Sequence, residues 1–98
     1  MLLYNVTIGI DKSLESQWLH YMKTKHIPDV LRTGMFVSGK MYKVLHDNED
    51  ETVSYSVQYF AKSITDVQRY LEEFAPALRD DHQKHFQHVA FRTLLEEA

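Results

Sequence analysis

The sequence predicts an α+β domain whose elements follow the order strand, helix, strand, strand, helix, strand. Four segments alternate apolar and polar residues with a period of two, which is typical of strands buried on one face. Two longer segments between them repeat apolar residues at helical spacing. A short acidic run joins the two middle strands and indicates an antiparallel hairpin. The 98 residues fit one domain, 1–98.

The strands are expected over residues 2–10, 35–47, 53–61 and 88–95. The run at 47–51 reads Asp-Asn-Glu-Asp-Glu and predicts a solvated turn. We expect the more apolar side of each strand to pack against the helices. In the last strand that side would carry Val89, Phe91, Thr93 and Leu95.

The first helix is predicted to break in its second half. Asp11 or Ser13 can cap its beginning, since both side chains accept hydrogen bonds from free backbone amides. We expect it to end near Lys25, because the residue before Pro28 is pushed out of the helical region. Pro28 suits the first turn of a second short helix, and Gly34 suits its exit. The apolar stripe of this segment is Leu14, Trp18, Met22 and His26.

The second helix begins after Ser63, with Asp66 as the reciprocal capping partner. Pro76 removes a backbone donor within the helical pattern and is expected to kink it. Two helices on one face of a four-stranded antiparallel sheet, in this order, form a ferredoxin-like βαββαβ sandwich.

The other sheet face is predicted to be mixed in character. It is too polar for a dry core, and Phe36, Tyr42 and Phe60 make it too aromatic for plain solvent surface. A second copy across a two-fold axis would cover it, so we expect a homodimer. The expected residues of this face are Asn5, Thr7, Phe36, Ser38, Lys40, Tyr42, Ser54, Ser56, Gln58, His88 and Arg92.

Composition excludes several classes of function. The formal charge is −3 and no basic stripe is present, which argues against nucleic acid as a partner. No apolar run is long enough to span a membrane, and the first residues lack the basic region of a secretory signal, so a cytoplasmic location is expected. No cysteine is present for disulfides or thiolate metal sites, and no cofactor motif stands out, so no cofactor is expected.

His26 is the first candidate for chemistry. It lies where the helix is expected to break, and an unperturbed imidazole titrates near neutral pH, which suits a general acid or base. The alternative is a structural role, in which its nitrogens bond backbone groups left free at the helix end. Nothing else in the sequence indicates a demonstrable enzyme activity.

His82, His85 and His88 form a second cluster, three histidines within seven residues. Asp80 and Asp81 could add oxygen ligands. The spacing matches no standard zinc signature, and His88 is expected on the following strand, so we predict a solvated helix end and no metal site.

The third candidate is a ligand site on the mixed sheet face. Lys40 and Arg92 could hold an anion while neutral side chains orient it. The alternative is a wet dimer interface whose charges pair with the partner. The candidate ligand-binding residues are Asn5, Lys40, Tyr42, Ser56, Gln58 and Arg92.

Several segments together resemble a small family of bacterial proteins of unknown function, domain-of-unknown-function family 4286. They include Tyr4-Asn5-Val6-Thr7, His26-Ile27-Pro28, Tyr55-Ser56-Val57-Gln58-Tyr59 and Val89-Ala90-Phe91-Arg92-Thr93-Leu94-Leu95. The resemblance implies a ferredoxin-like protein that dimerises as an α/β barrel, and it implies no reaction.

Three functions therefore stay open. The first is a small homodimer that binds a polar or anionic ligand between its two sheets. The second is a cofactor-independent isomerase or monooxygenase-like enzyme with His26 as acid/base, an analogy drawn from the fold superfamily alone. The third is a pure interaction module.

Overall fold

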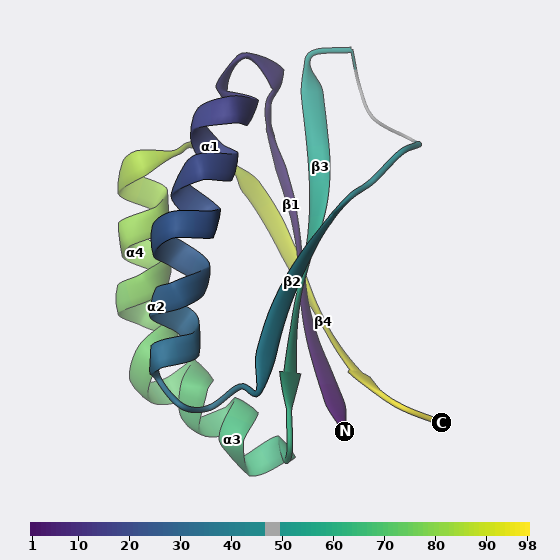
Figure 1. The fold of residues 1–98 in the computed structure, drawn as a ribbon, viewed down its shortest axis with the longest axis vertical. Helices are drawn as coiled ribbons and strands as arrows, with labels where there is room; N and C mark the ends of the chain where they lie inside the picture. Colours follow the sequence, from purple (N-terminus) through teal and green to yellow (C-terminus); the bar gives the residue numbers. More distant parts are fainter. Residues whose placement is uncertain (47–49) are drawn as a thin grey trace.

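Four antiparallel strands form one sheet in the order β2-β3-β1-β4, and two helical stretches cover one of its faces (Figure 1). The computed structural model describes residues 1–46 and 50–98, so the predicted turn at 47–51 lies largely outside the described residues. The order of elements is the predicted one, and the fold is ferredoxin-like. The elements are β1 (Leu2–Asp11), η1 (Lys12–Leu14), α1 (Glu15–Tyr21), η2 (Met22–His26), α2 (Ile27–Arg32), β2 (Ser38–Lys43), β3 (Thr52–Ala61), α3 (Ile64–Arg69), η3 (Tyr70–Phe74), α4 (Ala75–His85) and β4 (Val89–Glu96).

β1 lies in the centre of the sheet and fixes its register. It pairs with β3 along its whole length, from Leu2 opposite Ala61 to Asp11 opposite Thr52. It pairs with β4 on its other side, and β2 extends the sheet beyond β3. β2 and β4 are therefore the edge strands.

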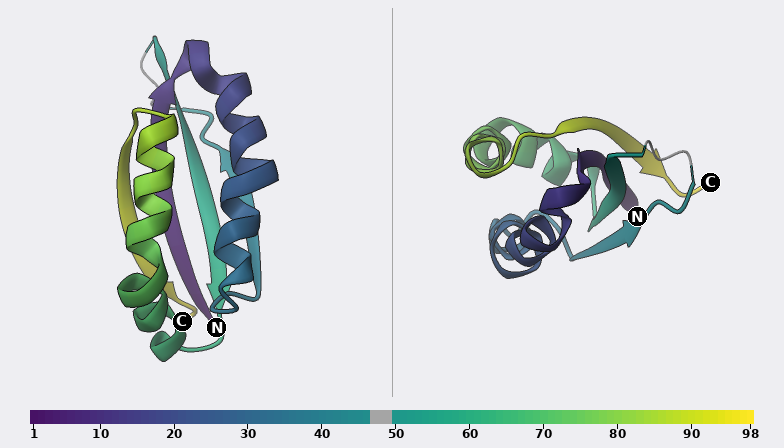
Figure 2. Two further views of the ribbon diagram at one scale, coloured as in Figure 1. Left: turned by 90° about the vertical axis from the view of Figure 1, so that its left-hand side faces the viewer. Right: turned by 90° about the horizontal axis from the view of Figure 1, so that it is seen from above.

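The core lies between the sheet and the helical layer (Figure 2). Trp18 from α1, Val30 from α2 and Val67 from α3 are fully buried there, as is Val57 of β3. Burying a side chain of this size contributes about 1.5–3 kcal/mol, so this layer provides most of the apolar stabilisation of the fold. Within the described residues, no helix is long and apolar enough to cross a membrane.

The predicted helix break at His26-Ile27-Pro28 is wrong. Ile27 is helical (φ −61°, ψ −46°), and the chain continues from α1 into α2 through the π-helical segment η2. Pro28 has no N–H to donate and its ring crowds the preceding turn. A wider π turn accommodates both effects without ending the helix.

The second helical stretch accommodates its proline in the same way. Pro76 follows the π-helical segment η3, which ends two residues before it, as η2 ends two residues before Pro28. Ser63 caps α3 through its side chain, as predicted, accepting from the backbone N–H of Asp66. Gly34 has a φ of 79°, which agrees with its predicted place at the helix exit.

The predicted faces of β2 and β4 need two corrections. Phe36 was expected on the open sheet face, but β2 begins only at Ser38, and the chain bends before it. Phe36 packs on the helix side instead, with ring centroids 4.8 Å from Tyr70 and 5.8 Å from Tyr4. The alternation of the strand therefore cannot be extended backwards through the bend.

In β4 the two faces are exchanged relative to the prediction. Phe91 lies opposite Thr7 on the open face and is 63% exposed. Arg92 lies opposite Val6, whose side chain faces the helices. Alternation defines two sets of residues but not which set the helices cover, and here the open face carries the more apolar set. That set is Val89, Phe91, Thr93 and Leu95.

A cavity between the helices and the sheet

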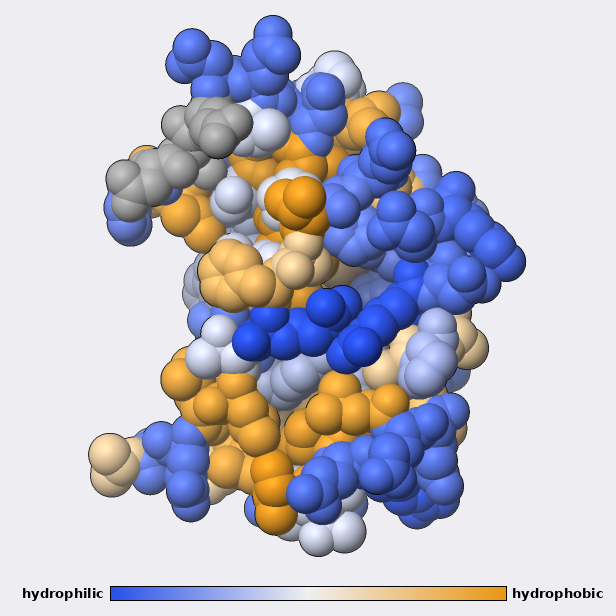
Figure 3. Space-filling model, turned by 180° about the vertical axis from the view of Figure 1, so that it is seen from behind, coloured by the Kyte–Doolittle hydropathy of each residue, from blue (hydrophilic) through white to orange (hydrophobic). Residues whose placement is uncertain are grey.

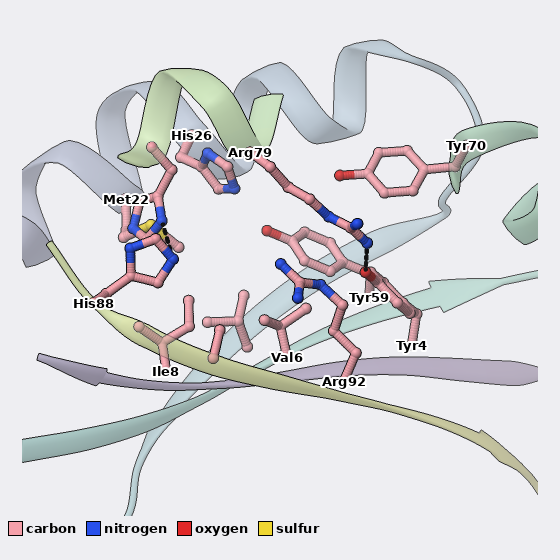
Figure 4. A pocket seen from close by; sticks show the side chains of 13 residues that line it. Tyr4, Val6, Ile8, Met22, His26, Tyr59, Tyr70, Arg79, His88 and Arg92 are labelled. Atoms are coloured by element: carbon pink, nitrogen blue, oxygen red, sulfur yellow. Dashed lines mark hydrogen bonds between the residues drawn. The ribbon is translucent and has the colours of Figure 1, made fainter. Parts of the chain in front are cut away.

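A cavity of about 40 Å³ lies between the sheet and the helical layer, on the side where α4 faces β4. Its floor is apolar and consists of Val6, Ile8 and Val57 from the two central strands. Its walls carry most of the polar side chains, and they come from both helical stretches and from β4 (Figure 4). The volume is about three times the minimum that holds one water molecule, so the cavity accommodates a small polar group.

Both π-helical segments contribute a wall residue. η2 provides Met22 and His26, and η3 provides Tyr70. A π turn holds one more residue than an α turn and so shifts which side chains face inward; such turns are frequent at functional sites. The two prolines that follow these segments therefore help to set the composition of the cavity.

Two polar atoms at the cavity are buried without a hydrogen-bond partner among the residues that the structure describes. They are Oη of Tyr59 and Nδ1 of His26. Tyr59 is only 2% exposed, and its hydroxyl points into the cavity (Figure 4). A buried group of this kind that stays unpaired costs about 1–3 kcal/mol. Native proteins rarely retain that cost without a water molecule or ligand group to relieve it.

The interior of the cavity is neutral at physiological pH. Burial lowers the pKa of His26 to about 4, against the opposing effect of the Asp81 and Asp29 carboxylates. Burial raises the pKa of Tyr59 far above its usual value, and it raises the pKa of Tyr70 to about 12. The imidazole is therefore unprotonated, and the two phenols keep their hydrogens.

His82 and His88 belong to a directed chain of hydrogen bonds. The indole N–H of Trp18 donates to Nε2 of His82 (2.9 Å), so the proton of His82 sits on Nδ1. That nitrogen lies 3.1 Å from Nε2 of His88, whose Nδ1 lies 2.9 Å from the carbonyl oxygen of Phe86. Burial, and then the neighbouring His88, lower the pKa of His82 to about 3. Both nitrogens of His82 are occupied, which makes it a structural residue that joins α4 to α1.

Two arginines lie at the mouth of the cavity, one on each side. Arg79 comes from α4 and donates to Oη of Tyr4 (3.2 Å), and Arg92 comes from β4. Both are exposed, and within the described part of the chain no carboxylate pairs with Arg92. The surface on this side shows a strongly hydrophilic band in its middle, with hydrophobic areas on either side of it (Figure 3).

The sequence-predicted ligand set divides between the two faces of the sheet. Asn5, Ser56 and Gln58 do meet on the open face, where Ser56 donates to Asn5 (2.5 Å) and Gln58 donates to Ser56 (3.1 Å). Lys40 and Tyr42 lie beside them in register, opposite Gln58 and Ser56. Arg92 lies on the helix side, so the set does not form one site, and His26, the predicted acid/base, also lies on that side.

Three residues of the cavity were missed in the sequence. Tyr59 and Tyr70 read as ordinary core aromatics, because nothing in a sequence reports an unpaired hydroxyl. Arg79 had a usable signal, since it lies three residues before His82 and so on the same side of α4.

Of the three clustered histidines, His82 and His88 contact each other and His85 lies apart. Nδ1 of His85 contacts the carbonyl oxygen of Asp81 (2.8 Å), and its ring stacks on Tyr21, outside the cavity. Among residues 1–46 and 50–98, no three His, Asp or Glu side chains are arranged to hold a metal ion.

The whole chain, residues 1–98, matches the family model described as Domain of unknown function (DUF4286). The chain belongs to this family. The resemblance seen in the sequence is thereby confirmed. No curated protein gives a significant match.

Solved structures of other proteins share the fold. An EthD family protein from Bacillus halodurans is 12% identical, with a TM-score of 0.71 and full coverage of both chains. A dimeric ferredoxin-like protein from an uncultured marine organism is 13% identical, with a TM-score of 0.70 over 100% of this chain and 95% of that one. The cofactor-independent oxygenase SnoaB from Streptomyces nogalater is 8% identical, with a TM-score of 0.62 over 98% and 92%. Identities this low establish the fold and no activity.

Proposed function

We propose that this protein binds a small organic anion at the cavity between α4 and β4. The observation that carries the proposal is the unpaired, buried hydroxyl of Tyr59, which faces the same cavity that Arg79 and Arg92 flank. This replaces the ligand site that the sequence suggested between two sheets, because Asn5 and Ser56 on the open face already bond to each other.

The charge of the ligand follows from the two guanidinium groups. Arginine forms paired, charge-assisted hydrogen bonds with carboxylate and phosphate groups. Arg92 has no acidic partner among the described residues, so a bound anion could form the ion pair that its guanidinium group lacks. Because both arginines are exposed, an anion at the mouth keeps part of its hydration and avoids the cost of full burial.

Amide NMR titration with acetate, propionate and inorganic phosphate tests the proposal. We expect shifts centred on β4 and α4, and a loss of about tenfold in affinity for Arg92→Gln, the value of one charge-assisted hydrogen bond. Arg69→Gln is the matched control, because Arg69 is an exposed arginine whose partner is Glu73. Equal affinities for the two variants, or no binding of any anion, would refute the proposal.

A second candidate function, cofactor-independent proton transfer, rests on His26. Its buried Nδ1 has no partner within the described residues, so a neutral imidazole nitrogen at the cavity can take a proton from a carbon next to a carbonyl group and return it. The test is exchange of the methyl protons of pyruvate in D₂O, followed by NMR. His26→Gln should abolish enzyme-dependent exchange, whereas His20→Gln, at an exposed position of α1, should not. Exchange no faster than in buffer would exclude this activity on pyruvate.

We also propose that a second copy of the chain covers the open sheet face. A row of apolar side chains is exposed along β4, namely Val89 (75%), Phe91 (63%) and Leu95 (46%). Contact of such a row with water is unfavourable, and exposed apolar patches of this kind mark protein–protein interfaces. One of the proteins with this fold is described as dimeric, which supports the proposal by analogy.

Sedimentation equilibrium of the wild type and of Phe91→Glu tests the dimer. We expect a dimer for the wild type and a monomer for the variant, because a charge would be buried without a partner. Ile64→Glu is the control, an exposed apolar residue (45%) on the helix side. A wild type that stays monomeric at 100 µM, as a rough upper working concentration, contradicts the proposal. A dimer that binds no anion would favour the interaction module instead.

A further inference from the structure

We infer that the ligand is a short oxo acid, bound with its carboxylate outward at Arg79 and Arg92 and its carbonyl group inward at Tyr59. This inference rests on the proposed function and specifies the ligand class of the same site. It follows from the size of the cavity, from the polarity of its interior and from the position of its charges.

The size of the cavity limits what can enter it. A volume of about 40 Å³ accommodates a group of a few heavy atoms. The remainder of the ligand must therefore lie at the mouth, between α4 and β4. A ligand with one small polar group beyond its charged end meets this requirement.

The interior selects a neutral acceptor. The floor of Val6, Ile8 and Val57 gives a buried carboxylate no compensating charge, and burying such a charge is costly. Tyr59 remains a phenol, and its hydroxyl has no acceptor within the described residues. A carbonyl oxygen supplies that acceptor and carries no charge of its own.

Among the described residues that line the cavity, the two arginines lie at its mouth. Arg79 is held in place by its hydrogen bond to Tyr4 (3.2 Å), on the opposite side of the mouth from Arg92. Figure 4 shows the guanidinium group of Arg92 rising from β4 toward the Tyr59 hydroxyl. A carboxylate at the arginines and a carbonyl at Tyr59 can therefore belong to one short molecule.

The experiment compares three oxo acids with carboxylic acids of the same chain length. The pairs are pyruvate with propionate, acetoacetate with butyrate, and levulinate with valerate, each measured by NMR titration. We expect at least one oxo acid to bind about tenfold more tightly than its parent acid, the value of one hydrogen bond to an otherwise unpaired donor. The pair with the largest ratio reports the spacing between Arg92 and Tyr59.

Two variants assign that ratio to its cause. Tyr59→Phe should reduce the ratio to about one, and binding of the parent acid at Arg92 should remain detectable, which also shows that the variant is folded. Arg92→Gln should weaken both members of each pair. Tyr55→Phe is the control, because its hydroxyl already donates to Glu15 and does not line the cavity.

The outcomes separate the inference from the proposed function. Parent acids that bind with an Arg92-dependent affinity, but with equal affinities for oxo acids, overturn the inference and leave the anion site intact. A preference for oxo acids that survives Tyr59→Phe overturns the assignment of the carbonyl to Tyr59. Absence of binding by all six acids overturns both proposals.

Discussion

Replacing Tyr59 with Phe should stabilise the unliganded protein. Tyr59 is 2% exposed and its Oη has no partner within the described residues, so the native state holds a desolvated hydroxyl. An unpaired hydroxyl of this kind costs about 1–3 kcal/mol, and a water in the cavity relieves part of it. We expect a gain of about 1 kcal/mol in the free energy of unfolding, or roughly 4–8 °C in Tm for a domain of this size.

Tyr55 provides the comparison on the same strand and the same face. Its Oη donates to Glu15 (2.5 Å), which also contacts Nζ of Lys43 (3.0 Å). Hydrogen bonds to charged groups contribute about 1.5–3 kcal/mol. Tyr55→Phe should therefore lower the free energy of unfolding by about 1.5 kcal/mol, the low end of that range, because Glu15 is partly exposed. The two substitutions, identical in chemistry, should act with opposite signs.

Urea denaturation of the two variants and the wild type, at pH 7.5 and one protein concentration, measures the difference. The fixed concentration matters because a dimer links stability to concentration. If Tyr59→Phe destabilises the protein as much as Tyr55→Phe does, the Tyr59 hydroxyl is well bonded. The premise of the ligand site would then fail.

Three further predictions concern the histidines, the helix exit and the hydrogen-bond chain. Burial lowers the pKa of His26 to about 4 and of His82 to about 3, from 6.5, so the unfolded chain takes up these protons first. The free energy of unfolding should therefore have its full value above pH 6.5 and fall by roughly 1.4 kcal/mol per pH unit for each histidine on the way to pH 4. In urea titrations His26→Asn should reduce this slope, and His20→Asn should not. Gly34→Ala should lower the free energy of unfolding by about 1–2 kcal/mol through its φ of 79° alone, since an added Cβ meets no atom within 4 Å. A change near zero in chemical denaturation would contradict the left-handed conformation. Trp18→Phe should lower the free energy of unfolding by about 2–3 kcal/mol and raise the pKa of His82, because Nε2 of His82 loses its donor. An unchanged His82 titration by NMR would show that the indole does not fix that tautomer.

The fold could be predicted because each element has a local cause in the sequence. Ser63 caps α3, Gly34 takes a positive φ, and period-two segments become strands. The helix break was predicted wrongly from an equally local cause. Pro28 forbids one hydrogen bond, but a helix can respond by widening as well as by ending, and the packing of Trp18 and Val30 favours continuity.

The candidate site was less predictable, because a cavity depends on packing between elements that are far apart in sequence. His26 was found as a candidate, since its place beside Pro28 marks an irregular turn. Tyr59 reads in the sequence like Tyr55, and only the presence of Glu15 beside one of them distinguishes the two hydroxyls. Arg92 was predicted as a ligand residue on the open face, whereas it lies on the helix side of the sheet.

That misassignment identifies β4 as the strand on which both proposed surfaces depend. Alternate residues serve opposite sides: Phe91 lies on the open face, and Arg92 lies at the mouth of the cavity. Because the side-chain period is two, a slip of β4 by one residue against β1 would exchange the sides of Phe91 and Arg92. The guanidinium group would then lie on the open sheet face, and the phenyl ring would lie at the mouth of the cavity. Within the described residues β4 is an edge strand with β1 as its one neighbour, so its register depends on what its side chains contact. A second copy that covers Phe91 would hold this register and would therefore also hold Arg92 in position for the ligand.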